Sequence, residues 1–336
     1  MPRTTIVLTL GAADLGLLRW AISPAWELLA SIRALHAPAA YGGIHMPWLT
    51  EHRDDPLLRS TGPEAVRTRA LTAGPRDHLP GFLAPTPASP LATVDDELRL
   101  VAGTRADVVR RDLRGVFPDG VPRALAPMLR APRRELTAAV RDLRAYWERA
   151  LAPAWPRIRG LLESDIHHRA RTLTERGPAA MFGGIHGDLT WQAHAGSGTL
   201  SVANRAGPAG PRRRVLDGRG LVLVPSAFAW PRVWVKTSEP WTPVLRYPVR
   251  GVAALWGAEA GARPDLAAAL GATRARLLLL LDTPATTDEL SRRTGLAAGG
   301  VSVQLHKLAA AGLVRGHRTG RSVLYARTGR GDALLA

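Results

Sequence analysis

The pattern of apolar and polar positions predicts a mixed architecture at the start of the chain. The short apolar run Thr5–Leu10 is typical of a strand. After Ser23-Pro24, apolar side chains recur at helical spacing from Trp26 to Leu35. Serine is a favoured helix cap and proline suits the first helical turn. A strand followed by a helix is therefore expected here.

The middle of the chain is predicted to be mostly helical. Residues 50–95 are rich in proline and charge, which predicts turns and short helices. Helical periodicity returns from Arg134 to about Arg176, with a break near Pro153 and Pro156. We therefore expect a long helical stretch that the prolines divide.

A strand-rich region follows the helices. Leu189–Ala195 and Thr199–Asn204 have strand-like patterns and flank a Gly-Ser-Gly turn, which predicts a hairpin. Residues 206–214, AGPAGPRRR, predict a surface loop. Further strands are predicted at Leu221–Pro225, Arg232–Thr237 and Pro243–Pro248. Residues 1–260 are therefore predicted to form one α+β domain, mainly helical first and mainly strand afterwards.

From Asp265 onward the pattern becomes regular, after a predicted linker at Gly257–Pro264. Leu266–Leu281 predicts one helix. Thr286 and Glu289 have the spacing of a capping box, in which each residue bonds the other's backbone amide at a helix start. A short helix from this point to about Thr294 is expected. We place a second domain at residues 261–336.

A second helix is predicted after a short turn that contains glycine. Gly295 suits the left-handed end of the preceding helix, and Leu296 is expected to point inward. The new helix runs to about Ala311, and Gly312 ends it. Its apolar face is formed by Val301, Leu305 and Leu308 at i, i+4 and i+7. Two helices joined in this way predict a helix-turn-helix, whose second helix enters the major groove of DNA.

A basic hairpin is predicted to follow the two helices. Leu313–Arg318 and Ser322–Arg327 have strand patterns, and Thr319-Gly320-Arg321 suits a tight turn. Between Leu290 and Gly331 there are eight basic residues and no acidic one. Such a surface attracts phosphates. The residues expected to contact DNA are Arg292, Arg293, Gly300, Ser302, Val303, Gln304, His306, Lys307, Arg315, His317, Arg318, Thr319 and Arg321.

Composition supports a polyanion partner and excludes several other chemistries. The formal net charge is +17, and only Lys236 and Lys307 are lysines among 45 basic residues. This arginine bias also fits a GC-rich genome, so the charge alone does not locate a site. The chain has no cysteine, which excludes disulfides and thiolate metal sites. No apolar run approaches the roughly 18 residues of a membrane helix.

The segment from Thr286 to Leu335 resembles the winged helix-turn-helix of ArsR-like bacterial repressors. The V-S-x-x-L pattern at Val301–Leu305, A-G-L-V at Ala311–Val314 and R-x-G-R at Arg318–Arg321 carry the resemblance. The whole chain also resembles actinobacterial ArsR-like regulators with a long N-terminal domain of uncharacterised role, in the stretches Ala21–Glu27, Ala145–Arg149 and Val224–Phe228. The resemblance implies DNA binding, a dimer and transcriptional control.

This chain departs from the family pattern in two places. The family's metal sensors carry a Cys-x-Cys pair, which is absent here, so thiolate metal sensing is excluded. Ala297-Ala298-Gly299-Gly300 replaces the usual polar residues at the start of the second helix. Glycine within a helix costs roughly 1 kcal/mol relative to alanine. The helix is therefore expected to start late or to have limited specificity.

Three other groups of residues have alternative interpretations. His186-Gly187-Asp188 resembles the catalytic loop of small-molecule kinases, although the expected asparagine position holds Ala193, so a turn before a strand is favoured. Glu163, Asp165, His167 and His168 resemble a metal cluster, although a long charged helix often produces such groups. All ten tryptophans lie before residue 257, where they fit either a ligand pocket or an ordinary core.

The sequence thus predicts an α+β N-terminal regulatory and dimerisation domain joined to a C-terminal winged helix-turn-helix. The expected function is a cytoplasmic, repressor-type transcriptional regulator that binds double-stranded DNA as a homodimer. We expect no enzymatic activity, no cofactor, no metal and no membrane association; an unknown small-molecule effector is left open. The alternative is an enzyme or a protein-interaction scaffold that uses the winged helix as a recruitment module.

Overall fold

The chain forms two compact units. The computed structural model describes residues 4–38, 43–75, 78–204, 210–252, 255–256, 264–281, 284–294, 296–319 and 322–335. The first unit comprises residues 1–40 and 52–249, and the second comprises 41–51 and 250–336. The chain therefore passes between the units at three places. The boundary predicted between residues 260 and 261 lies outside the described residues.

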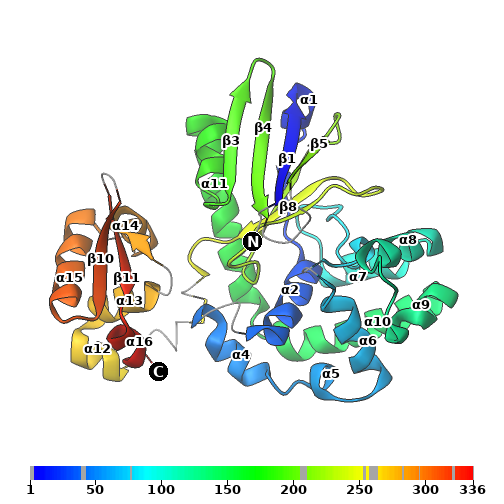
Figure 1. Cartoon of the computed structure of the whole chain (residues 1–336), viewed down its shortest axis with the longest axis horizontal. Helices are drawn as coiled ribbons and strands as arrows, with labels where there is room; N and C mark the ends of the chain where they lie inside the picture. Colours follow the sequence, from blue (N-terminus) through cyan, green and yellow to red (C-terminus); the bar gives the residue numbers. More distant parts are fainter. Residues whose placement is uncertain are drawn as a thin grey trace. The chain divides into compact units, whose positions relative to one another are not determined.

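The first unit contains most of the helices and two sheets, as Figure 1 shows. Its helices are α1 (Ala12–Gly16), α2 (Pro24–His36), α5 (Pro56–Arg59), α6 (Pro63–Thr72), η3 (Gly81–Leu83), α7 (Val94–Ala102), α8 (Ala106–Val116), η4 (Arg123–Leu125), α9 (Ala126–Arg130), α10 (Pro132–Tyr146), the π-helical turn η5 (Trp147–Leu151) and α11 (Trp155–Gly183). Its strands are β1 (Thr4–Gly11), β2 (Arg19–Trp20), β3 (Leu189–His194), β4 (Ser197–Asn204), β5 (Gly210–Val215), β6 (Val222–Ser226), β7 (Trp234–Lys236) and β8 (Val244–Pro248).

Both sheets of the first unit are mixed. One has the order β3-β4-β1-β5, with β4 antiparallel and β5 parallel to β1. The other has the order β2-β6-β8-β7, with only β7 antiparallel. The loop predicted at 206–214 is wrong for residues 210–214, which form β5; residues 206–209 lie outside the described part of the chain. The local sequence pattern did not predict this strand, because the strand forms by pairing with β1, about 200 residues earlier.

The predicted helices of the first unit are confirmed in their main features. Ser23 caps α2, and its hydroxyl accepts a hydrogen bond from the Trp26 amide at 3.2 Å. The predicted break near Pro153 separates η5 from α11. Within α11 the backbone leaves helical geometry at Gly177, where φ is 75°, a value that favours glycine.

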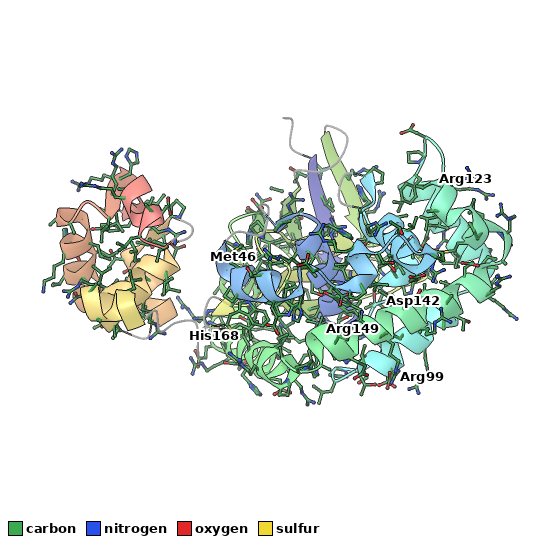
Figure 2. All side chains as sticks on the ribbon, turned by 90° about the horizontal axis from the view of Figure 1, so that it is seen from below. Met46, Arg99, Arg123, Asp142, Arg149 and His168 are labelled. Atoms are coloured by element: carbon green, nitrogen blue, oxygen red, sulfur yellow. The ribbon has the colours of Figure 1, made fainter. Side chains whose placement is uncertain are left out.

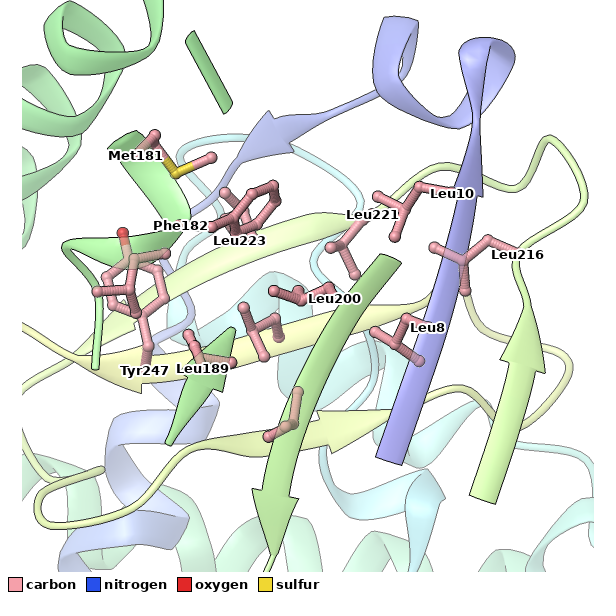
Figure 3. Packing of buried hydrophobic residues seen from close by; sticks show 13 residues of the cluster. Leu8, Leu10, Met181, Phe182, Leu189, Leu200, Leu216, Leu221, Leu223 and Tyr247 are labelled. Atoms are coloured by element: carbon pink, nitrogen blue, oxygen red, sulfur yellow. The ribbon is translucent and has the colours of Figure 1, made fainter. Parts of the chain in front are cut away.

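The core between the two sheets is filled by apolar side chains from several elements. Figure 3 shows Leu8 and Leu10 of β1 near Leu200 of β4, with Met181 and Phe182 from the end of α11 beside them. Leu223 and Tyr247 of the second sheet, and Leu221 just before β6, belong to the same cluster. Because strands and helices distant in sequence share this core, the first unit folds as one domain.

Several charged groups lie inside the first unit. The Glu27 carboxylate accepts hydrogen bonds from the amides of Ala227 and Phe228 at 3.0 and 3.2 Å. Glu97 accepts from the Ser23 hydroxyl at 2.7 Å and from the Ala25 amide at 2.8 Å. Burial raises the pKa of both carboxyl groups to about 7. These carboxylates connect α2 and α7 to neighbouring backbone.

A buried arginine and a half-buried lysine accompany these carboxylates. Arg246 is 2% exposed, donates to the Ala84 carbonyl at 2.9 Å, and lies 4.5 Å above the Trp26 ring. Lys236 donates to the same carbonyl at 2.6 Å and lies 4.1 Å above the Trp241 ring. Burial lowers the pKa of Arg246 to about 10 and that of Lys236 well below its ordinary value. Tryptophan thus serves packing and cation–π contacts in this unit.

The second unit is smaller and contains a three-stranded sheet with order β10-β11-β9. Its elements are η1 (Gly43–His45), most of α4 (Met46–His52), α12 (Pro264–Leu270), α13 (Ala272–Leu280), β9 (Ala285–Thr286), α14 (Thr287–Thr294), α15 (Ala298–Ala310), β10 (Val314–Thr319), β11 (Ser322–Arg327) and α16 (Gly329–Ala333). The single helix predicted at Leu266–Leu281 is wrong. Gly271, with φ 81°, separates α12 from α13.

The molecule therefore has an α+β fold with a C-terminal winged helix-turn-helix. The core of the second unit combines Leu277 and Leu278 of α13 with Leu290, Leu305 and other apolar side chains of α14, α15 and the sheet. Among the described helices, none combines the length and apolar character needed to cross a membrane.

Candidate nucleic-acid interface

The start of α14 is fixed by the predicted capping box. The Thr286 amide donates to the Glu289 carboxylate at 2.8 Å, and the Glu289 amide donates to the Thr286 hydroxyl at 3.3 Å. Leu290 on the inner side of α14 is fully buried. The capping box gives hydrogen-bond acceptors to two amides that have no partner within the helix. The leucine anchors the helix to the core.

The turn between α14 and α15 is held by two side chains of α14. The Ser291 hydroxyl donates to the Leu296 carbonyl at 2.6 Å, and the Leu296 amide donates to the Thr294 hydroxyl at 3.3 Å. The prediction that Leu296 points inward is wrong, because its side chain is 40% exposed. Gly295, the predicted end of the first helix, lies outside the described residues.

The helix α15 presents one buried and one exposed face, as its spacing predicts. Val301, Leu305 and Leu308 are at most 1% exposed and form the buried face. Val303 is 52% exposed, Gly300, His306 and Lys307 are exposed, and Ser302 and Gln304 are half-buried. The apolar anchors thus turn the predicted recognition residues away from the core of the second unit.

Two of the predicted recognition side chains already have contacts within the unit. The Gln304 side-chain oxygen accepts a hydrogen bond from Arg274 of α13 at 3.4 Å. The His306 Nδ1 lies 2.8 Å from the Ser302 carbonyl oxygen, and its ring packs edge-on against Tyr325. Sequence reasoning did not identify Arg274, because nothing in the helix-turn-helix pattern marks a residue 30 positions upstream.

The predicted wing is present as the hairpin of β10 and β11. Arg315, His317 and Arg318 are exposed on β10. Gly316 lies between them, where an added Cβ would come within 3.0 Å of the Val323 side chain and 3.2 Å of the Tyr325 ring. A larger residue there would displace the ring that closes the core, so glycine lets the strand pack tightly.

Three exposed cations lie on α15 and the hairpin. Within the described part of the chain, Lys307, Arg315 and Arg318 form no ion pair. Arg327 differs, because its guanidinium contacts Asp332 at 2.9 Å and is 17% exposed. The acid-free interval from Leu290 to Gly331 therefore includes one arginine whose charge is offset by an acid just beyond it.

The remaining predicted residues cannot be placed as side chains. Arg292 and Arg293 lie on the backbone of α14, and Thr319 ends β10, but their side chains are outside the described part. Arg321 at the predicted wing tip also lies outside the described residues. The predicted DNA-contact residues of α15 and β10 thus belong to the same unit, the second.

Comparisons with known proteins agree with this geometry. Residues 270–317, which span α13, α14, α15 and most of β10, match the family model of a helix-turn-helix domain. The second unit carries a helix-turn-helix. Residues 124–253 match a family of unknown function, DUF5937. No curated protein and no solved structure matches the chain. The helix-turn-helix match supports a DNA-binding regulator in general.

The other candidate sites gain no support as catalytic or metal centres. Asp165 is buried and pairs with Arg169 at 3.2 Å. Among the described residues, no group of three histidine, aspartate or glutamate side chains could hold a metal. In the kinase-like sequence, the Asp188 amide donates to His186 Nδ1 at 3.1 Å, which makes a local turn before β3.

Proposed function

We propose that the protein is a transcriptional repressor that binds duplex DNA as a homodimer. In this proposal α15 enters the major groove and the β10–β11 hairpin lies along the phosphate backbone. The observation that carries it is the set of exposed cations Lys307, Arg315 and Arg318, which pair with no acid among the described residues, on a helix and hairpin that share one core. Unpaired cations on such a surface can neutralise phosphates without first breaking an ion pair.

Phosphate contacts would set affinity, and base contacts would set specificity. Ser302 and Gln304 are the candidate base readers, and a bidentate pair discriminates by roughly 1–3 kcal/mol. Gln304 must first leave Arg274, or must reach the base with the amide group that Arg274 does not use. Arg274 is thus a further candidate for control of specificity.

The finer features of the proposal come from the resemblance to ArsR-like repressors. That resemblance supports the winged type, the dimer and repression rather than activation. We also propose a cytoplasmic location. We also propose that the first unit has a regulatory and dimerisation role rather than an enzymatic one. The chain crosses between the units three times, so segment 41–51 of the second unit lies in sequence between two parts of the first. This connection supports a regulatory link between the units.

A gel-shift experiment on DNA from the protein's own promoter region tests the proposal. Arg318→Ala combined with Arg321→Ala should weaken binding clearly, because each lost arginine removes a phosphate contact. Arg276→Ala is the matched control, since this exposed arginine lies on α13, outside the predicted surface. Equal binding by the double variant and the wild type would contradict the role of the hairpin.

The dimer is tested separately. A homodimer should protect two half-sites about 34–36 Å apart along the DNA, which footprinting would reveal. A single protected half-site, with a monomer in sedimentation, would overturn this part of the proposal and leave DNA binding intact.

A further inference from the structure

A small cavity in the first unit is lined mainly by cationic and apolar side chains. Its volume is about 180 Å³. It lies where the end of α2 meets α5 and α6, and its lining residues are Leu35, His36, Pro38, Arg53, Leu58, Arg59 and Arg69. A water in liquid occupies roughly 30 Å³, so the cavity can hold a phosphate or carboxylate group but not a drug-sized molecule.

Two of the arginines are oriented by bonds that leave most of their donors unused. Arg69 donates through Nη1 to the carbonyls of Leu58 and Ser60 at 2.7 and 2.8 Å. Arg59 donates through Nε to the Arg53 carbonyl at 2.7 Å. Among the described residues, the other guanidinium nitrogens of Arg59 and Arg69 have no hydrogen-bond partner. An oxyanion is the ligand that such oriented, unused donors fit best.

Among the described residues, none of the side chains that line the cavity is acidic, and two aspartates follow the lining Arg53 directly in the sequence. Asp54 contacts Arg53 at 3.3 Å and is 78% exposed. Asp55 is buried, accepts from the Leu57 amide at 2.8 Å, and pairs with Arg149 at 3.1 Å. Arg149 lies on the helical side of the first unit, as Figure 2 shows. Asp54 therefore offsets part of the charge of Arg53, whereas Arg59 and Arg69 form no ion pair with any described residue.

Burial, with the nearby positive charge, keeps the histidine in the cavity neutral. Burial, followed by the charges of Arg33, Arg69 and Arg59, lowers the pKa of His36 to about 4. The Nε2 atom of the neutral ring lies 3.0 Å from the Thr72 hydroxyl oxygen. Three arginines and a neutral imidazole thus surround a space whose other walls are leucine and proline.

We propose that this cavity binds the phosphate or carboxylate group of a small metabolite. The lining residues come from both sides of segment 41–51, which belongs to the second unit although its flanks belong to the first. An anion that draws Arg53 and Arg59 toward His36 would therefore act on both ends of this segment. As a regulator of DNA binding the anion is an effector, and this part rests on the proposed function.

Calorimetric titration of the full-length protein with inorganic phosphate, without DNA and at constant ionic strength, tests the site. Arg59→Gln and Arg53→Gln should each weaken binding about tenfold, because a charged donor is lost. Both residues are exposed, so the variants should fold. Arg171→Gln is the matched control, an exposed arginine on α11 that also has a carboxylate neighbour. Equal affinities of all variants, or no saturable binding of any anion tested, would overturn the site.

A parallel titration with malonate distinguishes the two anion classes. Tighter binding of phosphate assigns the site to phosphorylated metabolites, and tighter binding of malonate assigns it to carboxylates. Bound anion should also raise the pKa of His36, which NMR can follow through the ring proton. An unchanged His36 pKa at saturation would place the anion elsewhere and overturn the assignment.

The effector role is tested by DNA affinity with and without saturating anion. A change in the wild type that is lost in Arg59→Gln supports it, and an unchanged affinity overturns it. A protein that binds the anion but no DNA would contradict the proposed function while leaving the cavity's assignment intact.

Discussion

The two units of the protein use positive charge in opposite ways. In the first unit, Arg246 is buried and Lys236 is half-buried, and both donate to backbone carbonyls. In the second unit, Lys307, Arg315 and Arg318 are exposed and have no acidic partner within the described residues. The same residue types therefore hold one unit together and give the other a surface suited to phosphates. Net charge alone would not have separated these roles.

This comparison shows that a charged side chain indicates a binding partner only where it is exposed. A buried guanidinium has lost its hydration and must recover that free energy from nearby acceptors and rings. An exposed guanidinium keeps its water and its counterions until a phosphate replaces them. Substitution of a buried cation should therefore change stability, whereas substitution of the exposed cations of the second unit should change salt-dependent binding.

The largest effect is expected for Arg246→Gln. Removing this charge leaves the Pro85 carbonyl and the Trp26 ring without their cationic partner, and removes the charge that lowers the pKa of Glu97. The free energy of unfolding should fall by about 3–5 kcal/mol in urea titrations. Arg213→Gln, an exposed arginine on β5, should stay within about 0.5 kcal/mol of the wild type. Similar losses in both variants would contradict the distinction.

Glu27→Gln should give a smaller loss together with a change in pH dependence. The amide keeps one acceptor for two backbone donors, which should cost about 1–3 kcal/mol. The folded pKa of Glu27 is about 7 against an ordinary 4.5, so the folded state binds more protons between these values. The free energy of unfolding contributed by Glu27 is thus present below pH 4.5 and falls as pH rises to 7.

The measurement for Glu27 is urea unfolding at pH 5, 6 and 7. In the wild type, Glu27 should make the free energy of unfolding fall by up to about 1.4 kcal/mol per pH unit as pH rises. This fall should be absent in the variant. Glu175→Gln, at an exposed site on α11, should leave the profile unchanged. Parallel profiles for Glu27→Gln and the wild type would show that the carboxyl does not titrate in this window.

The third prediction concerns the exposed cations. Replacing both Arg315 and Arg318 by glutamine should leave thermal unfolding nearly unchanged. It should reduce the slope of log affinity against log salt by about 1.8, because about 0.9 is lost for each phosphate contact. Fluorescence anisotropy with labelled duplex DNA at several salt concentrations measures it. An unchanged slope would indicate that the hairpin lies away from the phosphates.

The smallest effect is expected at the start of α15. Gly299 has helical geometry, and an added Cβ would meet no atom within 4 Å. Gly299→Ala should therefore raise the stability of the second unit by about 0.5 kcal/mol, through a smaller entropy loss on folding. Calorimetric unfolding would detect it. A stability gain with weaker DNA binding would show that the glycine allows close approach to the backbone of DNA, and a loss of stability would contradict the argument.

The second unit was the more predictable from sequence because its signals are local. The capping box of Thr286 and Glu289 and the spacing of Val301, Leu305 and Leu308 lie within one or two helical turns. Gly271 was missed because the leucine run of α13 masked a left-handed backbone position just before it.

In the first unit the missed features depend on distant pairing. β5 has no alternating apolar pattern and forms only because β1 offers it an edge. The arginine-lined cavity combines residues from separate elements of the first unit, and in the second unit the contact of Arg274 with Gln304 also joins two elements. The residue types of these sites could be read from the sequence, but the fact that the residues come together in space could not.

The strand β5 has a further consequence for how copies of the chain meet. It is the last strand of its sheet among the described residues, and Arg212, Arg213 and Arg214 are all exposed along it. An open strand edge can pair with another copy and start aggregation, and dense like charge opposes that approach. Three consecutive arginines therefore act as gatekeepers of this edge, and replacing them with threonine would remove that protection.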